Sequence, residues 1–269
     1  MARSHTPHRT LLALILLGLM EIAFLSLGNW QLDRAAQRES IKAAIDTGRS
    51  TPPLRLQSDT AAKHLVPWRP AIAHGVWLHK FTVLLENRNY QGRPGYWVAT
   101  PLLIDQGANT AVLVLRGWLP RPMRPNEALA DVPAPAGEQT INGELLERVP
   151  RLFELWSWSD KGATELPATL PDPAKPLPKL QNLDLSDYGR ATGLTLVPAV
   201  LAEQAVGAGP SGATSKPGQL LQEWPEPSLD ADKNRGYALQ WFGFATIAAG
   251  AWLVIAWRAL RRKNQSKTL

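Results

Sequence analysis

The stretch YALQWFGFATIAAGAWLVIAW, Tyr237 to Trp257, decides the fold of this chain. It has no charged residue, and five Lys or Arg residues follow it before the chain ends. At about 1.5 Å per helical residue the run is about 31 Å long, close to the hydrocarbon thickness of a bilayer. Aromatic rings lie toward both ends, where headgroup layers favour them. The sequence therefore predicts a transmembrane helix over residues 236–257.

A second apolar run, Leu11 to Gly28, lies behind a basic N-terminal tip that carries Arg3 and Arg9. Because both tips of the chain carry only basic charges, the positive-inside rule places both in the cytoplasm. Two ends on one side require an even number of crossings. We expect cytoplasmic tips at residues 1–10 and 258–269, spans at 11–29 and 236–257, a membrane-proximal helix at 30–49, and an outer domain at 50–230.

The first span has a second interpretation. Its ten-residue apolar core, with Ser26 and Gly28 spaced like a cleavage site, also fits a signal peptide. An uncleaved anchor is favoured because the helical pattern continues through Trp30 to Ile45 before Pro52 and Pro53 end it. Glu21 lies inside this span, either as a neutral carboxyl that faces the second helix or as a proton or partner contact.

Composition excludes several classes of protein. The net charge is +6, but seven of the 29 Lys and Arg residues lie in the two tips. The rest of the chain has 22 basic and 23 acidic residues. A body that is nearly neutral argues against nucleic-acid binding. The absence of cysteine excludes disulfides, thiolate metal sites and thiol catalysis.

The outer domain reads as β structure. Strand-like segments occur at residues 64–80, 81–104, 110–120, 140–149 and 194–204, separated by turns. We predict a mainly antiparallel sheet that forms a sandwich or a small barrel. One short helix is expected over residues 185–193, closed by Gly193. The proline-rich connectors 120–137 and 167–178 are expected on the surface, and 207–218 as a flexible loop.

Catalytic and metal sites receive no support from the sequence. His74 and His79 are five residues apart, so within one strand they would point to opposite faces. The catalytic and phosphate-binding motifs with known spacing are absent from the sequence. Among the eleven tryptophans, Trp118, Trp156 and Trp158 are expected in the core or at contacts between the domain and the membrane. We therefore predict neither an enzyme nor a metal site.

The outer mouth of the two spans is the more promising site. Trp30, Arg34 and Arg38 recur every four residues, which places them on one helix face. Simple anchoring by an aromatic ring and two lipid-facing cations explains this pattern as well. Small residues, Ala245 with Ala249 and Thr246 with Gly250, would let the two helices approach closely. Such a mouth could hold a flat hydrophobic ligand that carries carboxylates.

Five blocks of sequence resemble, in order, those of the surfeit locus protein 1 family of cytochrome c oxidase assembly factors. They are GNWQLDR, WRPAIAHGVWLH, RPGYWVATPLLI, VLVLRGWLP and NRGYALQWFGFA, and the resemblance runs over residues 25–257. It implies two transmembrane helices that flank a periplasmic domain, in a multi-pass protein of the bacterial inner membrane. The implied function is assembly of the oxidase, by maturation of its subunit I together with other assembly factors, and delivery of haem a. A general envelope scaffold that contacts respiratory subunits without binding haem is the alternative.

The resemblance also suggests the residues of a haem site. The positions that match the family motifs are Gly28, Trp30, Gln31, Arg34, Arg69, Pro70, Gly75, His79, Gly95, Pro101, Arg116, Gly117, Pro120, Tyr237 and Trp241. Family members commonly carry a histidine three residues before the tyrosine, where this chain has Asn234.

We therefore expect Trp30, Tyr237 and Trp241 to form an apolar slot at the membrane surface. Arg34 and Arg116 would pair with the haem propionates. His79 remains as the aligned histidine. Arg116 has a structural alternative, in which its fork satisfies backbone carbonyls at the end of a strand.

Overall fold

The computed structural model describes residues 6–124, 128–152, 166–172, 177–205 and 220–265. The chain divides into a helical unit, Met1–Ala43 with Pro227–Leu269, and a β unit, Ala44–Glu226. The loop expected at 207–218 and the tryptophans Trp156 and Trp158 lie outside the described residues.

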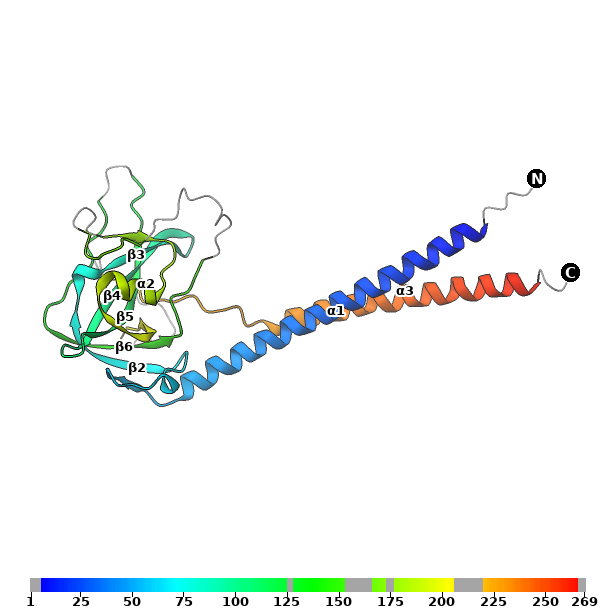
Figure 1. Cartoon of the computed structure of the whole chain (residues 1–269). Helices are drawn as coiled ribbons and strands as arrows, with labels where there is room; N and C mark the ends of the chain where they lie inside the picture. Colours follow the sequence, from blue (N-terminus) through cyan, green and yellow to red (C-terminus); the bar gives the residue numbers. More distant parts are fainter. Residues whose placement is uncertain (1–5, 125–127, 153–165, 173–176, 206–219, 266–269) are drawn as a thin grey trace. The chain divides into compact units, whose positions relative to one another are not determined.

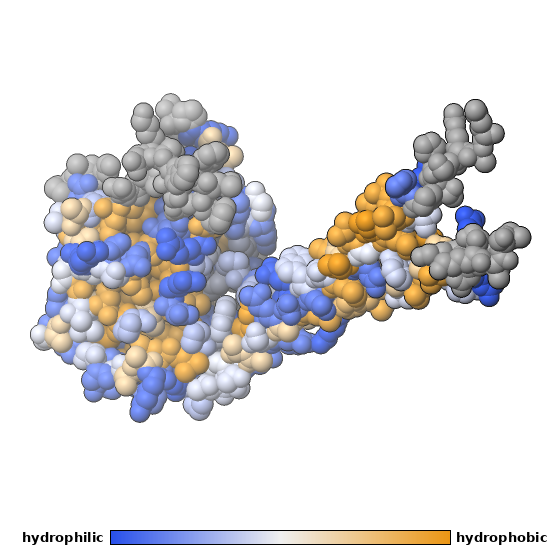
Figure 2. All heavy atoms as spheres, turned by 45° about the vertical axis from the view of Figure 1, so that its right-hand side comes forward, coloured by the Kyte–Doolittle hydropathy of each residue, from blue (hydrophilic) through white to orange (hydrophobic). Residues whose placement is uncertain are grey.

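Two long helices run antiparallel and form a hairpin in the helical unit (Figure 1). Helix α1 spans Thr6–Ser50 without a break and ends just before Pro52, as predicted. Helix α3 spans Ala231–Gln265 and is longer at both ends than the predicted span. Both helices are long and apolar enough to cross a membrane. Figure 2 shows apolar surface on the part of the hairpin near the termini and polar surface along the rest.

The two helices meet along one line of residues on each helix, and successive residues of each line are alternately three and four positions apart. We call this contact line the seam. Its buried and half-buried residues are Leu14, Leu17, Glu21, Phe24, Gly28, Gln31, Ala35 and Arg38 on α1, and Ala231, Asn234, Ala238, Trp241, Ala245 and Ala248 on α3. This is the heptad pattern of a coiled coil. Glu21 lies on the seam. Of the small residues predicted there, Ala245 lies on it, whereas Thr246 and Gly250 are exposed.

The helices touch closely at Gly28. A Cβ atom at this position would lie 2.5 Å from the Phe242 ring, so only glycine fits without a shift. Farther along the seam, the Trp252 indole Nε1 donates to the Leu14 carbonyl at 3.0 Å. On one flank of the seam, Arg235 forms an ion pair with Glu39.

The β unit contains eight strands in one mixed sheet. They are β1 (Leu54–Leu56), β2 (Pro70–Trp77), β3 (Val83–Tyr90), β4 (Arg93–Asp105), β5 (Thr110–Pro120), β6 (Glu138–Leu146), β7 (Lys179–Leu180) and β8 (Thr195–Glu203). The order is β1-β2-β6-β8-β5-β4-β3-β7, and β2 also pairs with β4. The pairing therefore closes a five-stranded ring, β2-β6-β8-β5-β4, which matches the barrel alternative.

Most pairings are antiparallel, as predicted, but β1–β2, β3–β7 and β5–β8 are parallel. Parallel pairing needs partners brought together by the rest of the fold, so hairpin patterns in the sequence do not reveal it. The short strands β1 and β7 were not predicted either. Two 3₁₀ helices, η1 (Ala62–His64) and η2 (His79–Phe81), complete the connections around β2.

Apolar side chains pack on both faces of the ring. Those inside it include Ala73, Trp77, Leu102, Val112 and Leu201, which come from four of its strands. On the outer side, helix α2 (Leu185–Thr192) and its flanking segments cover β3, β4 and β5.

Helix α2 begins and ends as the sequence predicts. Asp184 caps its N-terminus by accepting from the backbone amides of Ser186 and Asp187. Gly193 closes it at φ 70°. The connector 167–178 is only in part the predicted surface excursion, because Leu170 is buried in the core beside α2. An apolar side chain within a proline-rich segment gave no periodic signal.

Candidate functional site

The residues predicted for the site fall into two groups. Trp30, Arg34, Tyr237 and Trp241 belong to the helical hairpin, and His79 and Arg116 belong to the β unit.

Aromatic rings gather on one flank of the hairpin seam. Trp241 stacks on Phe24 with ring centroids 5.8 Å apart and meets Phe244 edge-on at 6.0 Å. Tyr237 lies four residues before Trp241 and Phe244 three after it, so all three follow one stripe of α3. The Tyr237 and Phe244 side chains are exposed. The stripe therefore presents an apolar, aromatic surface.

Trp30 and Arg34 lie on α1 toward the end of this stripe that carries Tyr237. The contact between Gln31 and Asn234 sets the register of the two antiparallel helices, so Trp30 is near the level of Arg235 and Arg34 is near the level of Ala231, farther from Trp241. Helical periodicity turns Trp30 and Arg34 to the flank that carries Trp241, whereas the ion pair between Arg235 and Glu39 lies on the other flank. Trp30 is 54% exposed. The Arg34 guanidinium Nη1 donates to the Gln37 Oε1 atom at 3.0 Å.

Asn234, at the position of the family histidine, faces the seam. Its side chain is 8% exposed, and its amide Nδ2 donates to Gln31 Oε1 at 2.7 Å. A polar pair on a largely apolar seam fixes the register of two helices. In this chain the position therefore holds α3 against α1.

His79 and Arg116 both lie near one tryptophan, Trp77. The Trp77 ring is 6.4 Å from the His79 ring, and the Arg116 guanidinium carbon lies 4.5 Å from the Trp77 centroid. His74 and His79 do not share a strand, because β2 ends at Trp77 and His79 begins η2. His79 Nε2 lies 3.2 Å from the Pro135 carbonyl oxygen.

Arg116 occupies a bulge of β5. Val98 pairs with Gly117 and Ala99 with Leu115, so Arg116 has no partner residue in β4. Its side chain is 5% exposed, and burial lowers the pKa of its guanidinium. Among the described residues, its Nε and Nη1 atoms are sealed from solvent without an acceptor. The alternative that its fork satisfies backbone carbonyls is therefore wrong for the described part of the chain.

A second buried arginine shows what a structural role looks like. Arg88 stacks on Trp97 at 4.4 Å, and its Nη2 donates to the carbonyls of Pro150 at 2.9 Å and Gln181 at 3.1 Å. Burial lowers the pKa of Arg88 to about 10. It joins two segments of the β unit, and Arg116 makes no such bonds.

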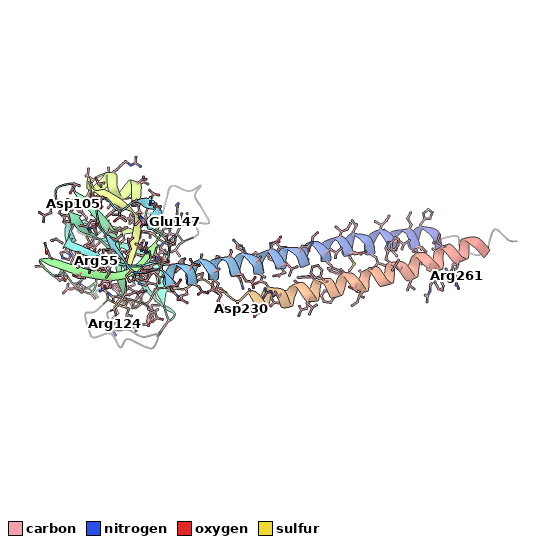
Figure 3. All side chains as sticks on the ribbon, turned by 90° about the horizontal axis from the view of Figure 1, so that it is seen from below. Arg55, Asp105, Arg124, Glu147, Asp230 and Arg261 are labelled. Carbon is pink, nitrogen blue, oxygen red and sulfur yellow. The ribbon has the colours of Figure 1, made fainter. Side chains whose placement is uncertain are left out.

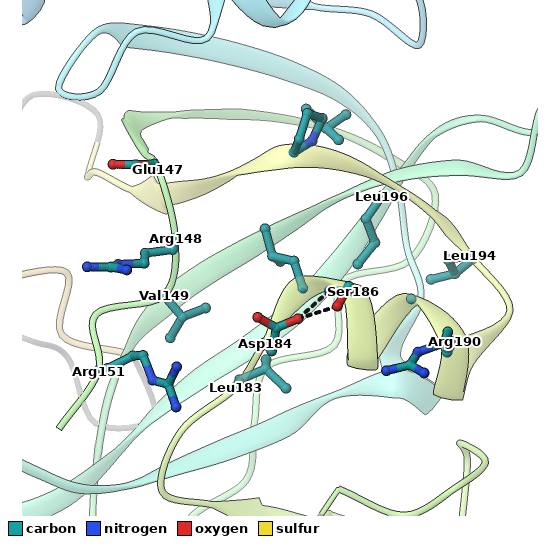
Figure 4. Close-up of a pocket in the computed structure, with 14 residues that line it drawn as sticks. Glu147, Arg148, Val149, Arg151, Leu183, Asp184, Ser186, Arg190, Leu194 and Leu196 are labelled. Atoms are coloured by element: carbon teal, nitrogen blue, oxygen red, sulfur yellow. Dashed lines mark hydrogen bonds between the residues drawn. The ribbon is translucent and has the colours of Figure 1, made fainter. Parts of the chain in front are cut away.

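The structure also contains a groove that the sequence did not indicate. It has a volume of about 700 Å³ and lies between the end of β6, α2 and β8 (Figure 4). Its floor is apolar, with Val149, Leu183 and Leu194, and Arg151 points toward Asp184 across it. Its residues come from three separate segments, so no local pattern announces it. Within the described ranges, no group of three or more His, Asp or Glu residues could hold a metal ion.

Comparisons with known proteins identify a family and a relative. The model of the SURF1 family matches residues 19–246, which covers α1 from Leu19, the whole β unit and α3 as far as Thr246. Cytochrome oxidase assembly protein SHY1 of Saccharomyces cerevisiae is 31% identical over 110 residues. That alignment covers 39% of this chain and only 28% of the yeast protein. On the match over residues 19–246, this chain belongs to the SURF1 family.

Proposed function

We propose that this protein is an assembly factor for cytochrome c oxidase, acting on the maturation of subunit I together with other assembly factors. Membership of the SURF1 family carries the proposal, and the name of the yeast relative, a cytochrome oxidase assembly protein, supports it. The protein acts as a chaperone-like factor without catalysis of its own. Deleting the gene should lower oxidase activity and the haem a content of membranes, and the wild-type gene should restore both.

We further propose that α1 and α3 span the bacterial inner membrane, with both tips in the cytoplasm and the β unit in the periplasm. The support is the length and apolarity of both helices and the basic tips. Because the chain has no cysteine, single introduced cysteines report topology cleanly. An impermeant maleimide should label Arg55→Cys in intact cells and Arg261→Cys only after lysis (Figure 3). The opposite labelling pattern would reverse the orientation.

Haem a is the proposed ligand of the aromatic flank. Trp30, Tyr237 and Trp241 offer ring faces to a macrocycle, and Arg34 offers donors for a propionate. Haem a supplies the redox-active iron of the oxidase, so this protein would only bind and hand it over. Asn234 has no imidazole, and its side chain is hydrogen-bonded to Gln31. The hairpin can therefore contact the face of the haem ring and a propionate, but Asn234 provides no ligand for the iron.

The β unit holds the other two residues predicted for a haem site. His79 has the imidazole that iron requires, and Arg116 has open donors for a propionate. These residues lie together around Trp77, in a unit separate from the hairpin candidates.

A haem titration of the purified protein tests this proposal. Protein co-expressed with haem a synthesis should show a bound-haem absorption spectrum, and the Arg34→Ala, Trp241→Ala double variant should bind at least about tenfold more weakly. Arg93→Ala, an exposed arginine at the start of β4, is the matched control. Unchanged affinity in the double variant would discard the slot.

A scaffold that contacts respiratory subunits without haem is the second candidate. The engagement of Asn234 in the seam favours it, because the usual ligand position is committed to helix pairing. Normal haem a content and normal oxidase activity after gene deletion would support this scaffold and refute the first candidate.

A further inference from the structure

We infer that the end of the β ring at Arg116 is a binding site for a carboxylate. The side chain of Arg116 shares its strand face with Val112 and Val114, which pack inside the ring. An arginine buried at 5% exposure is costly unless its donors are used. The inference depends on which of the guanidinium N–H groups have an acceptor.

None of the five guanidinium N–H groups of Arg116 reaches an acceptor in the part of the chain that the structure describes. Nε and Nη1 are sealed from solvent and have no hydrogen-bond partner. Nη2 is not among the sealed atoms, so the tip of the guanidinium keeps a path to the surface. A group that enters from outside can therefore reach Nη2 and the neighbouring Nη1 together, which is the fork that a carboxylate fits.

The surroundings of Arg116 hold it in place and leave the fork open. The Trp77 ring supports the guanidinium plane at 4.5 Å. The Gln222 amide donates to the Arg116 backbone carbonyl at 3.4 Å, so it uses none of the side-chain donors. Pairing of Trp118 with Leu221 holds the segment around Gln222 beside β5. The fork is therefore preorganised by groups that do not occupy it.

Glu203 balances the charge of Arg116 without binding it. Each of the two charged side chains influences the ionisation of the other, and neither is hydrogen-bonded to the other. A ligand carboxylate would thus compete with Glu203 for the same cation. Removing the charge of Glu203 should strengthen carboxylate binding, whereas a purely structural arginine would give no such gain.

The test uses the full chain in detergent and 4-fluorobenzoate as the probe, followed by ¹⁹F NMR line broadening. We expect Arg116→Met to weaken binding at least about tenfold, and Glu203→Gln to strengthen it several-fold. The neutral probe 4-fluorobenzamide should bind more weakly than the carboxylate. Arg55→Met, an exposed arginine on β1, is the control and should leave binding unchanged.

Three results would overturn the inference: no broadening of the carboxylate signal, equal binding by the Arg116→Met variant, or weaker binding by Glu203→Gln. If Arg116→Met fails to fold, as judged by circular dichroism, Arg116→Lys decides. It keeps the charge and loses the fork, and it should still weaken binding. The measurement uses purified protein, so it does not depend on the proposed role in oxidase assembly. A gene deletion with no effect on the oxidase would refute that role and leave this site untouched.

Discussion

Replacing Arg49 by methionine should destabilise the β unit by about 2 kcal/mol. Arg49 Nε lies 3.0 Å from Glu144 Oε2, and Arg49 Nη2 lies 2.8 Å from Glu226 Oε1. The two carboxylates differ in environment, since the Glu144 side chain is 9% exposed and that of Glu226 is 60% exposed. Breaking a fully buried pair costs about 3–5 kcal/mol, and the 41% exposure of the Arg49 side chain reduces that figure here.

The difference in exposure gives the experiment its control. Glu226→Gln should cost less than about 0.5 kcal/mol, because exposed pairs contribute little. Glu144→Gln should destabilise the wild type but partly rescue Arg49→Met, because it removes the buried charge that the first change leaves unpaired. Urea denaturation of the full chain in detergent, followed by tryptophan fluorescence, measures each value. The reasoning fails if Glu226→Gln costs as much as Arg49→Met, or if Glu144→Gln lowers stability equally in both backgrounds.

Three further changes test other parts of the structure. Asp184→Ala should cost about 1 kcal/mol in urea denaturation at pH 7, with Asp184→Asn nearly neutral. Hydrogen bonds from Ser186 lower the pKa of Asp184. The stabilisation that the ionised Asp184 carboxylate gives is therefore complete above about pH 4, and it should disappear as the pH falls below the folded pKa. Burial raises the pKa of Glu203, so wild-type stability should fall as the pH rises from about 4.3 through the folded pKa. Glu203→Gln should remove that fall, as measured by unfolding curves over a series of pH values. Gly28→Val should lower the melting temperature of the helices by circular dichroism, while Gly18→Val, with no atom within 4 Å of its new Cβ, should not.

The helices were predictable because their signals are local. An uncharged run fixes α3, a pair of prolines stops α1, and Gly193 closes α2 in the left-handed conformation that glycine adopts most readily. Six of the strands were found within the five apolar segments for the same reason. The strands β1 and β7 were missed, since two or three residues carry no periodic pattern and are held only by their neighbours.

The candidate site was predictable only in part. The helical period suffices to put Trp30 and Arg34 on one face, but the register set by Gln31 and Asn234 decides which residues of α3 stand opposite. The role of Arg116 depends on a bulge and on the lack of an acceptor for its Nε and Nη1 atoms among the described residues, neither of which the sequence displays. The position of His79 after the end of β2 likewise follows from tertiary packing.

The order of strands around the ring has a consequence for synthesis. Strand β2 emerges first among the five, yet its main neighbour β6 comes some sixty residues later, and β5 waits for β8, the last of them. Strand β2 therefore exposes a hydrogen-bonding edge until residue 146 leaves the ribosome, and β5 exposes one until residue 203 does. A message cut short before that point should give an aggregating product instead of a smaller folded domain, and a holding chaperone would be most useful during that interval.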